Sequence, residues 1–316
     1  MASMILKSIS PNTTKLGFIG VGVMGQSMAA HLMKHGYAMT VYSRTASKCA
    51  ALVEAGAKLA RSPKEVAEQS DIIFSIVGYP KDVESVMLGS SETGARDAVI
   101  DGVRPGSIVV DMTTSKPSIA KRLHELFKEK SVFSMDCPVS GGDIGARNAA
   151  LTIMCGGDQE VFDALVPVLQ CMGKTVRLMG GPGMGQATKC ANQTMIASTM
   201  VGVCEALLFA HKSGLNVEDV IAVLSGGAAQ CFSLTSYGPR ILKGDMKPGF
   251  YVEHFVKDMK IVLEECDRMG IVLPGLTQAK MLYEILIAQG GGRLGTQALM
   301  LALEKLNNIE FVPKNL

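Results

Sequence analysis

Lys189 is the side chain in this sequence whose setting most directly suggests proton transfer. It lies near the start of an apolar helical pattern, and two amides, Asn192 and Gln193, follow it three and four residues later. This spacing places the amine and an amide on one face of a helix. Apolar neighbours and a nearby helix N-terminus disfavour the charged form of a lysine, so Lys189 can donate or accept a proton near neutral pH. The competing interpretation is a surface lysine whose stem lies along apolar neighbours.

Ser140, Gly141 and Gly142 form a second candidate group, shortly after a predicted strand at 132–136. Ligands of open α/β sheets bind beyond the carboxyl ends of the strands. A hydroxyl beside two glycine amides can form a concave anion site, which suits a substrate carboxylate. An ordinary loop without a ligand is the competing interpretation of this segment.

A third group is the glycine pattern Gly20-x-Gly22-x-x-Gly25, which follows an apolar strand pattern at 16–19 and precedes a helical pattern that ends at Gly36. In this context Gly20 permits a tight turn, Gly22 lets a pyrophosphate approach the backbone, and Gly25 lets the helix pack on the strand. The helix N-terminus then offers free N–H groups to the phosphates. The expected cofactor contacts are Gly20, Val21, Gly22, Val23, Met24 and Gly25.

The end of the next predicted strand, 39–42, indicates which dinucleotide binds. An NAD enzyme carries Asp or Glu there to hold the ribose 2′-hydroxyl, whereas this chain has Ser43, Arg44 and Thr45. A carboxylate would repel a 2′-phosphate, while an arginine with flanking hydroxyls can bind its oxygens. We therefore expect NADP(H) as the preferred cofactor, with NAD(H) as the alternative. The competing interpretation of Arg44 is a solvated loop cation.

Strand and helix patterns alternate as far as residue 178, in the manner of a doubly wound parallel sheet. Beyond Gly180 the remaining patterns are helical. We therefore predict an α/β protein with an N-terminal Rossmann-type doubly wound sheet at 1–180 and an all-α domain at 181–316. The predicted strands are 16–19, 39–42, 71–77, 108–112, 132–136, 151–155 and 176–178. The later predicted helices are 46–55, 63–68, 118–130, 161–170, 184–213, 217–225, 255–269, 273–289 and 296–306.

Charge and cysteine content argue against several classes of protein. The 316 residues hold 31 Lys and Arg against 29 Asp and Glu, a net charge of +2, so no nucleic-acid partner is expected. The eight cysteines are scattered, without a C-x-x-C pair or a cysteine–histidine cluster, and indicate neither disulfides nor a metal site. They are typical of a reducing compartment such as the cytoplasm.

Two segments bear on membranes and location. The longest apolar run, 194–210, is interrupted by Glu205, so it predicts a buried helix and no membrane span. The first 15 residues lack arginine and a true apolar region, so no secretory signal is expected. A trimmed targeting remnant, for example a mitochondrial one, is the alternative to a cytoplasmic location.

Four segments besides the glycine pattern carry a family resemblance: 113–115, 136–146, 183–193 and 250–258. In this order they resemble the β-hydroxyacid dehydrogenase family, which includes 3-hydroxyisobutyrate dehydrogenases, glyoxylate/succinic semialdehyde reductases and tartronate semialdehyde reductases. The resemblance runs from Leu16 to about Asn308. Similarity to the plant-type 3-hydroxyisobutyrate dehydrogenase-like proteins is carried by 76–80, 249–252 and 294–299.

The resemblance implies roles for the first two groups. Lys189 would be the catalytic lysine, which donates a proton to the developing alkoxide as hydride arrives, or removes it in the oxidative direction. Ser140 and the two glycines after it would bind the substrate carboxylate, with an amide close by. Many relatives carry asparagine four residues after the lysine, where this chain has Gln193 preceded by Asn192, so both amides are candidates for the substrate contact.

The resemblance also implies contacts from other segments. The further cofactor contacts would be Val77 and Gly78 under the cofactor, Thr114 near the nicotinamide, and Lys257 from the helical domain. Phe250 and Asp258 match positions that line the site in glyoxylate reductases. The helical domains of relatives pack together, which implies a homodimer or homotetramer.

The expected function is hydride transfer between NADP(H) and a small carboxylate substrate. This substrate would be a hydroxy acid or aldehyde acid such as 3-hydroxyisobutyrate, glyoxylate or succinic semialdehyde. The alternatives are an imine reductase, which has the same fold, and a non-catalytic cofactor-binding protein. One departure from the relatives is Ala149, where they tend to have glycine; it would matter only if the backbone there has a positive φ.

Overall fold

The computed structural model of the chain describes residues 9–89 and 97–311. These residues form two compact units, which divide between Lys189 and Cys190. Most of the N-terminal segment in which a targeting remnant was considered, residues 1–8, lies outside the described residues.

The first unit contains a six-stranded sheet in the order β3-β2-β1-β4-β5-β6, and all of its pairings are parallel. The strand order reverses beside β1, which is the switch point where Rossmann folds bind a dinucleotide. The predicted Rossmann-type sheet is therefore confirmed. Its strands are β1 (Lys15–Ile19), β2 (Ala38–Tyr42), β3 (Lys58–Leu59), β4 (Ile72–Ser75), β5 (Ile108–Asp111) and β6 (Phe133–Asp136).

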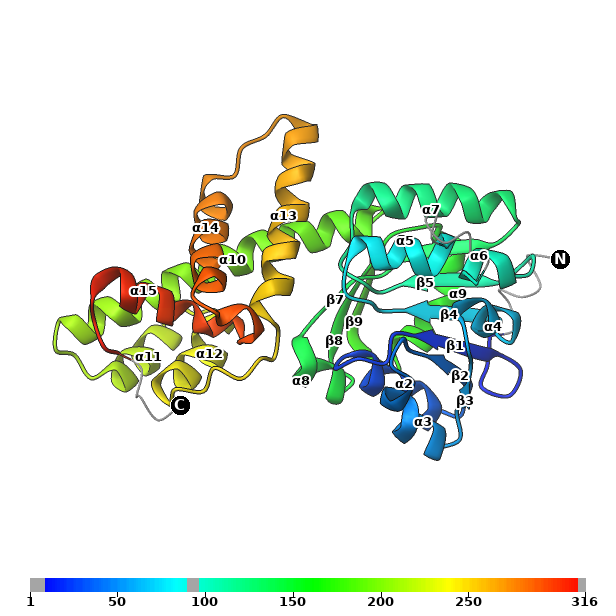
Figure 1. Cartoon of the computed structure of the whole chain (residues 1–316), viewed down its shortest axis with the longest axis horizontal. Coiled ribbons are helices and arrows are strands. Elements are labelled where there is room, and N and C mark those ends of the chain that lie inside the picture. Colours follow the sequence, from blue (N-terminus) through cyan, green and yellow to red (C-terminus); the bar gives the residue numbers. More distant parts are fainter. Residues whose placement is uncertain (1–8, 90–96, 312–316) are drawn as a thin grey trace. The chain divides into compact units, whose positions relative to one another are not determined.

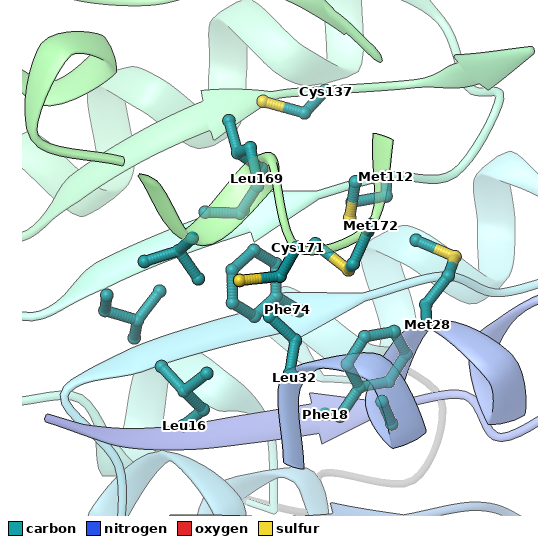
Figure 2. Packing of buried hydrophobic residues seen from close by; sticks show 14 of the residues in the cluster. Leu16, Phe18, Met28, Leu32, Phe74, Met112, Cys137, Leu169, Cys171 and Met172 are labelled. Atoms are coloured by element: carbon teal, nitrogen blue, oxygen red, sulfur yellow. The ribbon is translucent and has the colours of Figure 1, made fainter. Parts of the chain in front are cut away.

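Alternate residues along the strands enter two separate cores, one on each face of the sheet. Phe18 and Phe74 stack at 6.1 Å and pack with Met28 on one face, as Figure 2 shows. Their neighbours Ile19 and Ile73 enter the core on the other face. Helices α2, α3 and α9 cover the first face and α4 to α7 the second, and the opposed sets of α2 with α3 and α5 with α7 are visible in Figure 1. The helices are α2 (Gly25–Lys34), α3 (Ala50–Glu54, after the 3-10 turn Ala46–Cys49), α4 (Pro63–Glu68), α5 (Pro80–Leu88), α6 (Val99–Gly102), α7 (Pro117–Glu129) and α9 (Gln159–Leu169).

Three further strands form a small second sheet in the same unit. In it β7 (Val139–Ser140) pairs antiparallel with β8 (Leu151–Cys155), which pairs parallel with β9 (Gly173–Leu178). The strand patterns at 151–155 and 176–178 were therefore predicted correctly but lie outside the six-stranded sheet. The short helix α8 (Gly142–Arg147) lies in the candidate anion-site segment, where no helix was predicted.

The described part of the second unit is helical, as predicted. Its isolated bridge, Tyr251 to Gly295, is the one β pairing there. Helix α12 was not predicted, because Gly238 and Pro239 lie inside it and break the helical pattern. The helices are α10 (Met184–Lys212, which begins in the first unit), α11 (Val217–Ser225), α12 (Phe232–Leu242), α13 (Val252–Met269), α14 (Pro274–Ala288) and α15 (Leu299–Asn307), with 3-10 turns at Gly291–Arg293 and Thr296–Ala298.

Helix α10 is long and apolar enough, by length and composition alone, to cross a membrane. Core helices of globular proteins pass the same test. Ala197, Met200, Cys204 and Leu207 of α10 are fully buried in the core of the second unit. This burial is typical of a core helix.

Candidate active site

Two of the three glycines after β1, Gly20 and Gly25, stand where the backbone has no room for a side chain. Gly20 has φ +96°, and a Cβ added to it would collide with the carbonyl oxygen of Ile76. A Cβ on Gly25 would collide with the carbonyl oxygen of Gly20, because α2 begins directly against the turn. Gly22, in contrast, has open space around it. The turn therefore leaves backbone at Gly22 that a ligand can approach closely.

Arg44 follows β2 and has a partner that the sequence did not predict. Its Nη1 donates to Oδ1 of Asp82 at 3.2 Å, and the Arg44 side chain is 80% exposed. The other oxygen of Asp82 accepts from the main-chain N–H of Tyr79 at the start of α5. Arg44 is thus an exposed cation at the end of β2, with an acidic residue beside it.

The loops after β4 and β5 are held together by hydrogen bonds. The N–H of Val77 donates to Oγ1 of Thr113 at 3.0 Å. The N–H of Thr113 and the hydroxyl of Ser75 both donate to Oδ1 of the buried Asp111, at 3.1 and 2.8 Å. The loops that carry Val77 with Gly78 and Thr114 therefore form one hydrogen-bonded structure at the carboxyl edge of the sheet.

Helix α10 begins against the end of β6 and the loop after β5. Oδ1 and Oδ2 of Asp136 accept from the main-chain N–H groups of Gly183 and Gln186, both at 2.7 Å. The side chain of Gln186 accepts from the N–H of Ser115 at 2.9 Å and donates to the carbonyl of Thr113 at 2.7 Å. Sequence reasoning missed both side chains, although a carboxylate at a strand end and a glutamine in the first turn of an apolar helix are visible signals.

The Asp136 carboxyl is also electrostatically unusual. Burial raises its pKa to about 7, against the hydrogen bonds from Gly183 and Gln186, which lower it; nearby Asp111 raises it further. Asp111 and Asp136 are directly paired in register across β5 and β6. Two carboxyl groups thus share the carboxyl edge of the sheet, and the nearby Asp111 disfavours ionisation of Asp136.

Lys189 and the Ser140 segment both lie in the first unit. Lys189 is 6% exposed and lies three residues after Gln186 on α10, so the two residues share one face of the helix. Ser140 ends β7, and Gly141 and Gly142, with φ +129° and +62°, lead into α8. The first N–H groups of a helix have no partner within it. The segment therefore combines a hydroxyl with amides that have no partner within α8.

The backbone at the C-terminal end of α8 shows that Ala149, where relatives tend to have glycine, has a positive φ. The N–H of Ala150 donates to the carbonyl of Gly145 at 2.8 Å, and that of Ala149 to Ala146 at 3.4 Å. These bonds form a Schellman motif, in which the residue at Ala149 takes the left-handed conformation. Ala149 has φ +50°, so an alanine occupies a backbone conformation that favours glycine.

In the second unit, Gln193 and Asp258 form a buried pair. Nε2 of Gln193 donates to Oδ2 of Asp258 at 2.6 Å, and Oε1 of Gln193 accepts from Nδ2 of Asn192 at 2.7 Å. Nζ of Lys257 lies 2.9 Å from Oδ1 of Asp258, whose side chain is fully buried. Both ends of the Gln193 amide are therefore occupied by protein groups, and Asn192 is the less buried of the two amides.

Phe250 belongs to an aromatic group at the start of α13. Its ring stacks on His254 with centroids 6.5 Å apart and meets Phe255 edge-on at 5.8 Å. Burial lowers the pKa of His254, and the charge of Lys257 lowers it further. This group presents a mainly uncharged aromatic surface near neutral pH.

The candidate residues are thus divided between the two units. The first unit holds the following: Gly20, Val21, Gly22, Val23, Met24, Gly25, Ser43, Arg44, Thr45, Val77, Gly78, Thr114, Ser140, Gly141, Gly142 and Lys189. The second unit holds Asn192, Gln193, Phe250, Lys257 and Asp258. All eight cysteines are free, and no group of three metal-binding side chains occurs among the described residues.

Two family models match consecutive parts of the chain. Residues 15–181 match the NAD-binding domain of 6-phosphogluconate dehydrogenase. Residues 183–303 match the NAD-binding domain of NADP-dependent 3-hydroxyisobutyrate dehydrogenase. The chain belongs to the β-hydroxyacid dehydrogenase family. It is an NAD(P)-dependent oxidoreductase of the 3-hydroxyacid type, with a Rossmann unit and a helical unit.

Individual relatives agree with this family membership. The probable 3-hydroxyisobutyrate dehydrogenase-like 1, mitochondrial, of Arabidopsis thaliana is 53% identical over 98% of this chain and 91% of its own length. The 2-hydroxy-3-oxopropionate reductase of Escherichia coli is 37% identical over 93% and 98%. The structure of Mycobacterium tuberculosis 3-hydroxyisobutyrate dehydrogenase with L-serine superposes with a TM-score of 0.81 at 25% identity, covering 92% of this chain and 99% of that one.

Imine reductases resemble this dehydrogenase in fold alone. The structure of the one from Pseudomonas sp. has a TM-score of 0.59 at 19% identity, with 92% of this chain and 99% of that one covered. The expectation that imine reductases share the fold of this chain is therefore confirmed. The similarity carries no information about the activity of this chain.

Proposed function

We propose that this enzyme moves hydride between NADP(H) and a small carboxylate that bears a hydroxyl or aldehyde group. The observation that carries the proposal is the buried Lys189, held on a helix whose first turn is hydrogen-bonded to the loop after β5. The open backbone at Gly22, between two glycines that admit no Cβ, fits a dinucleotide phosphate. When bound, the nicotinamide supplies or accepts the hydride.

Lys189 provides the proton in this proposal. During reduction its ammonium group donates a proton to the carbonyl oxygen of the aldehyde, and during oxidation its amine removes the hydroxyl proton. Ser140 and the amides of Gly141 and Gly142 hold the substrate carboxylate. Asn192 supplies the amide contact, because both ends of the Gln193 amide are already bonded to Asp258 and Asn192.

The proposed preference for NADP(H) rests on Arg44. Its guanidinium is 80% exposed at the end of β2, and the adjacent residues Ser43 and Thr45 carry hydroxyls in place of a carboxylate. In its ion pair with Asp82 the guanidinium is exposed while the Asp82 side chain is only 14% exposed, and a pair that water screens from the arginine side contributes about 1 kcal/mol. Arg44 can therefore exchange Asp82 for a 2′-phosphate at little cost, and NAD(H) remains the alternative cofactor.

The proposed substrates are small hydroxy acids and aldehyde acids, and a panel of such compounds tests the proposal. The candidates are 3-hydroxyisobutyrate, glyoxylate and succinic semialdehyde, together with 2-hydroxy-3-oxopropionate, the substrate in the name of the Escherichia coli relative. We expect at least one to give saturable turnover, with kcat/KM higher with NADPH than with NADH for the aldehyde acids, and higher with NADP+ than with NAD+ for 3-hydroxyisobutyrate. A cyclic imine in the same panel tests the imine reductase alternative. Binding of NADPH without turnover of any compound would support a non-catalytic protein and contradict the proposal.

We also propose a homo-oligomer, dimeric or tetrameric, formed through the helical unit. Several large apolar side chains of that unit are more than half exposed: Met195, Phe209, Val223, Phe232 and Met281. Static light scattering should give two or four times the 33.5 kDa mass of one chain; a monomer would contradict this. The name of the Arabidopsis relative makes a mitochondrial location a proposal beside the cytoplasmic one.

A further inference from the structure

The N-terminus of α10 is capped by a side chain from a different element. Asp136, the last residue of β6, accepts from the N–H groups of Gly183 and Gln186 at 2.7 Å each. Helices α4 and α11 take their caps from the residue directly before them, Ser62 and Asn216. The start of α10 is therefore tied to the parallel sheet, whereas those two helices are capped only locally.

The side chain of Gln186 provides a second connection. Both ends of its amide bond to the main chain of one loop, at the N–H of Ser115 and the carbonyl of Thr113. Gln186 is 1% exposed, so water cannot take the place of these partners. Loss of the bonds would leave buried polar groups unsatisfied, which costs free energy. A side-chain amide carries its donor and its acceptor on separate atoms, so Gln186 can bond to two points of the loop that carries Thr114 and join it to α10.

The backbone around these bonds is in direct contact. A Cβ on Gly185 would collide with the main-chain oxygens of Asp136 and Met154, and a Cβ on Gly156 would collide with the Asp136 carboxylate. The first turn of α10 therefore packs on the strand ends without an intervening side chain. Such packing leaves little freedom for the turn to shift while its hydrogen bonds are kept.

Lys189 lies one turn beyond these anchors on the same helix. A helix rises about 1.5 Å per residue, so Lys189 is about 4.5 Å along the axis from Gln186. Displacement of the first turn would displace Lys189 with it. A shift of about 1 Å in a reacting group can cost about 100-fold in rate.

We propose that Asp136 and Gln186 are positioning residues, which fix the amine of Lys189 relative to the loop at 113–115. This inference rests on the proposed function, in which Lys189 transfers the proton. Neither side chain touches substrate in this account. Asp136 holds the helix through its main-chain N–H groups, and Gln186 sets the separation between the helix and the loop.

Two variants test the proposal, Asp136→Asn and Gln186→Met. The first keeps the shape of the side chain but removes one of its accepting oxygens, and the second keeps the length of the side chain but removes the amide. We expect kcat to fall about 10- to 100-fold in each, with the Kd for NADPH changed less than about threefold. The matched controls are Asp163→Asn and Gln159→Met, an exposed pair on α9 joined by a 2.8 Å hydrogen bond, and both should retain wild-type kcat.

The kinetic isotope effect separates positioning from loss of folded protein. With NADPH deuterated at the transferred position, the wild type should show a small effect on kcat if a later step limits turnover. A displaced Lys189 slows the chemical step, so the effect should grow in both variants. A merely smaller fraction of folded enzyme would lower kcat and leave the isotope effect unchanged, and that result would overturn the proposal.

Hydrogen–deuterium exchange provides a readout that does not depend on activity. In the absence of substrate, amides at 183–189 and 113–115 should exchange faster in the two variants than in the wild type and the α9 controls. Unchanged exchange would contradict the anchoring role even if kcat falls. If Lys189→Ala retains full turnover, the proposed function fails, and faster exchange in the variants would still establish the anchoring separately.

Discussion

The proposed choice of NADP(H) over NAD(H) rests on one residue, Arg44. Its type and its place after β2 were visible in the sequence, and they favour a 2′-phosphate over a free 2′-hydroxyl. Its ion pair with Asp82 was not visible, because the two residues are 38 positions apart in the sequence. The carboxylate holds the guanidinium in place, but it also repels the phosphate that Arg44 would bind.

Asp82→Asn should therefore improve the use of NADPH. The ion pair is screened by water on the side of the exposed Arg44, so its loss, about 1 kcal/mol, corresponds to a decrease in KM for NADPH of about fivefold. The KM for NADH should stay unchanged, and the amide oxygen of the new side chain can still accept from the N–H of Tyr79. Steady-state kinetics with both cofactors measure this. A higher KM for NADPH would instead mean that Asp82 is needed to hold Arg44 for the phosphate.

Arg44→Asp should reverse the preference of the enzyme toward NAD(H). A carboxylate at this point repels a 2′-phosphate and can accept from the ribose 2′-hydroxyl. The ratio of kcat/KM with NADPH to that with NADH is the measurement, and Arg177→Asp, which changes an exposed arginine on β9, is the matched control. Unchanged affinity for NADPH in Arg44→Asp would count against the assignment of Arg44.

The Asp136 carboxyl should make stability depend on pH. Its pKa is about 7 in the folded protein and near 3.8 in the unfolded chain. Between these values the folded state holds a proton that the unfolded state has released, so stability falls as pH rises through this window. The slope for one such group is at most about 1.4 kcal/mol per pH unit.

Urea unfolding at pH 5, 6, 7 and 8 tests this dependence. The free energy of unfolding of the wild type, taken relative to that of Asp136→Asn, should decrease from pH 5 to 7 and change little above that. The difference between the wild type and Asp163→Asn should not follow this course. A difference between the wild type and Asp136→Asn that rises with pH would show that the folded protein lowers the pKa of Asp136.

Among the helices and strands, the bounds of the long and regular elements could be predicted from the sequence. Helix α11 matches its predicted bounds, 217–225, and α10 differs by one residue at its end, because apolar residues recur at helical spacing and Gly214 stops the pattern. Short elements rich in glycine or proline, such as α8 and α12, lack that signal. The role of Asp136 was hidden for a different reason: its partners lie 47 and 50 residues away, and only the fold brings them together.

Ala149→Gly should stabilise the C-terminal end of α8. Alanine at φ +50° costs about 1 kcal/mol relative to glycine, and the greater freedom of glycine in the unfolded chain offsets part of this gain. We expect the free energy of unfolding to rise by about 0.5 kcal/mol. Thermal or urea unfolding measures it. Ala51→Gly, an exposed site inside α3, should lower stability by a similar or larger amount, and destabilisation by Ala149→Gly would contradict the account.

At the scale of the whole molecule, the order of elements was the most predictable property. Alternating strands and helices up to residue 178, followed by helices alone, correspond to a Rossmann unit and a helical unit. The family match extends over both parts, 15–181 and 183–303. The small sheet of β7, β8 and β9 was not separable from the main sheet by sequence, because strand patterns carry no information about partners. Substrate choice depends on pocket shape, where one methylene is worth only about 1 to 3 kcal/mol.

The role of Lys189 as proton donor is tested most directly by single-turnover reduction with Lys189→Ala, using the aldehyde acid that the wild type reduces best. Removal of the general acid should lower the rate of hydride transfer by about 10²- to 10⁴-fold. The Kd for NADPH, measured by its fluorescence, should stay unchanged, and Lys174→Ala, at an exposed lysine of β9, should behave as the wild type. A rate within about tenfold of the wild type in Lys189→Ala would contradict the assignment of Lys189 as the proton donor.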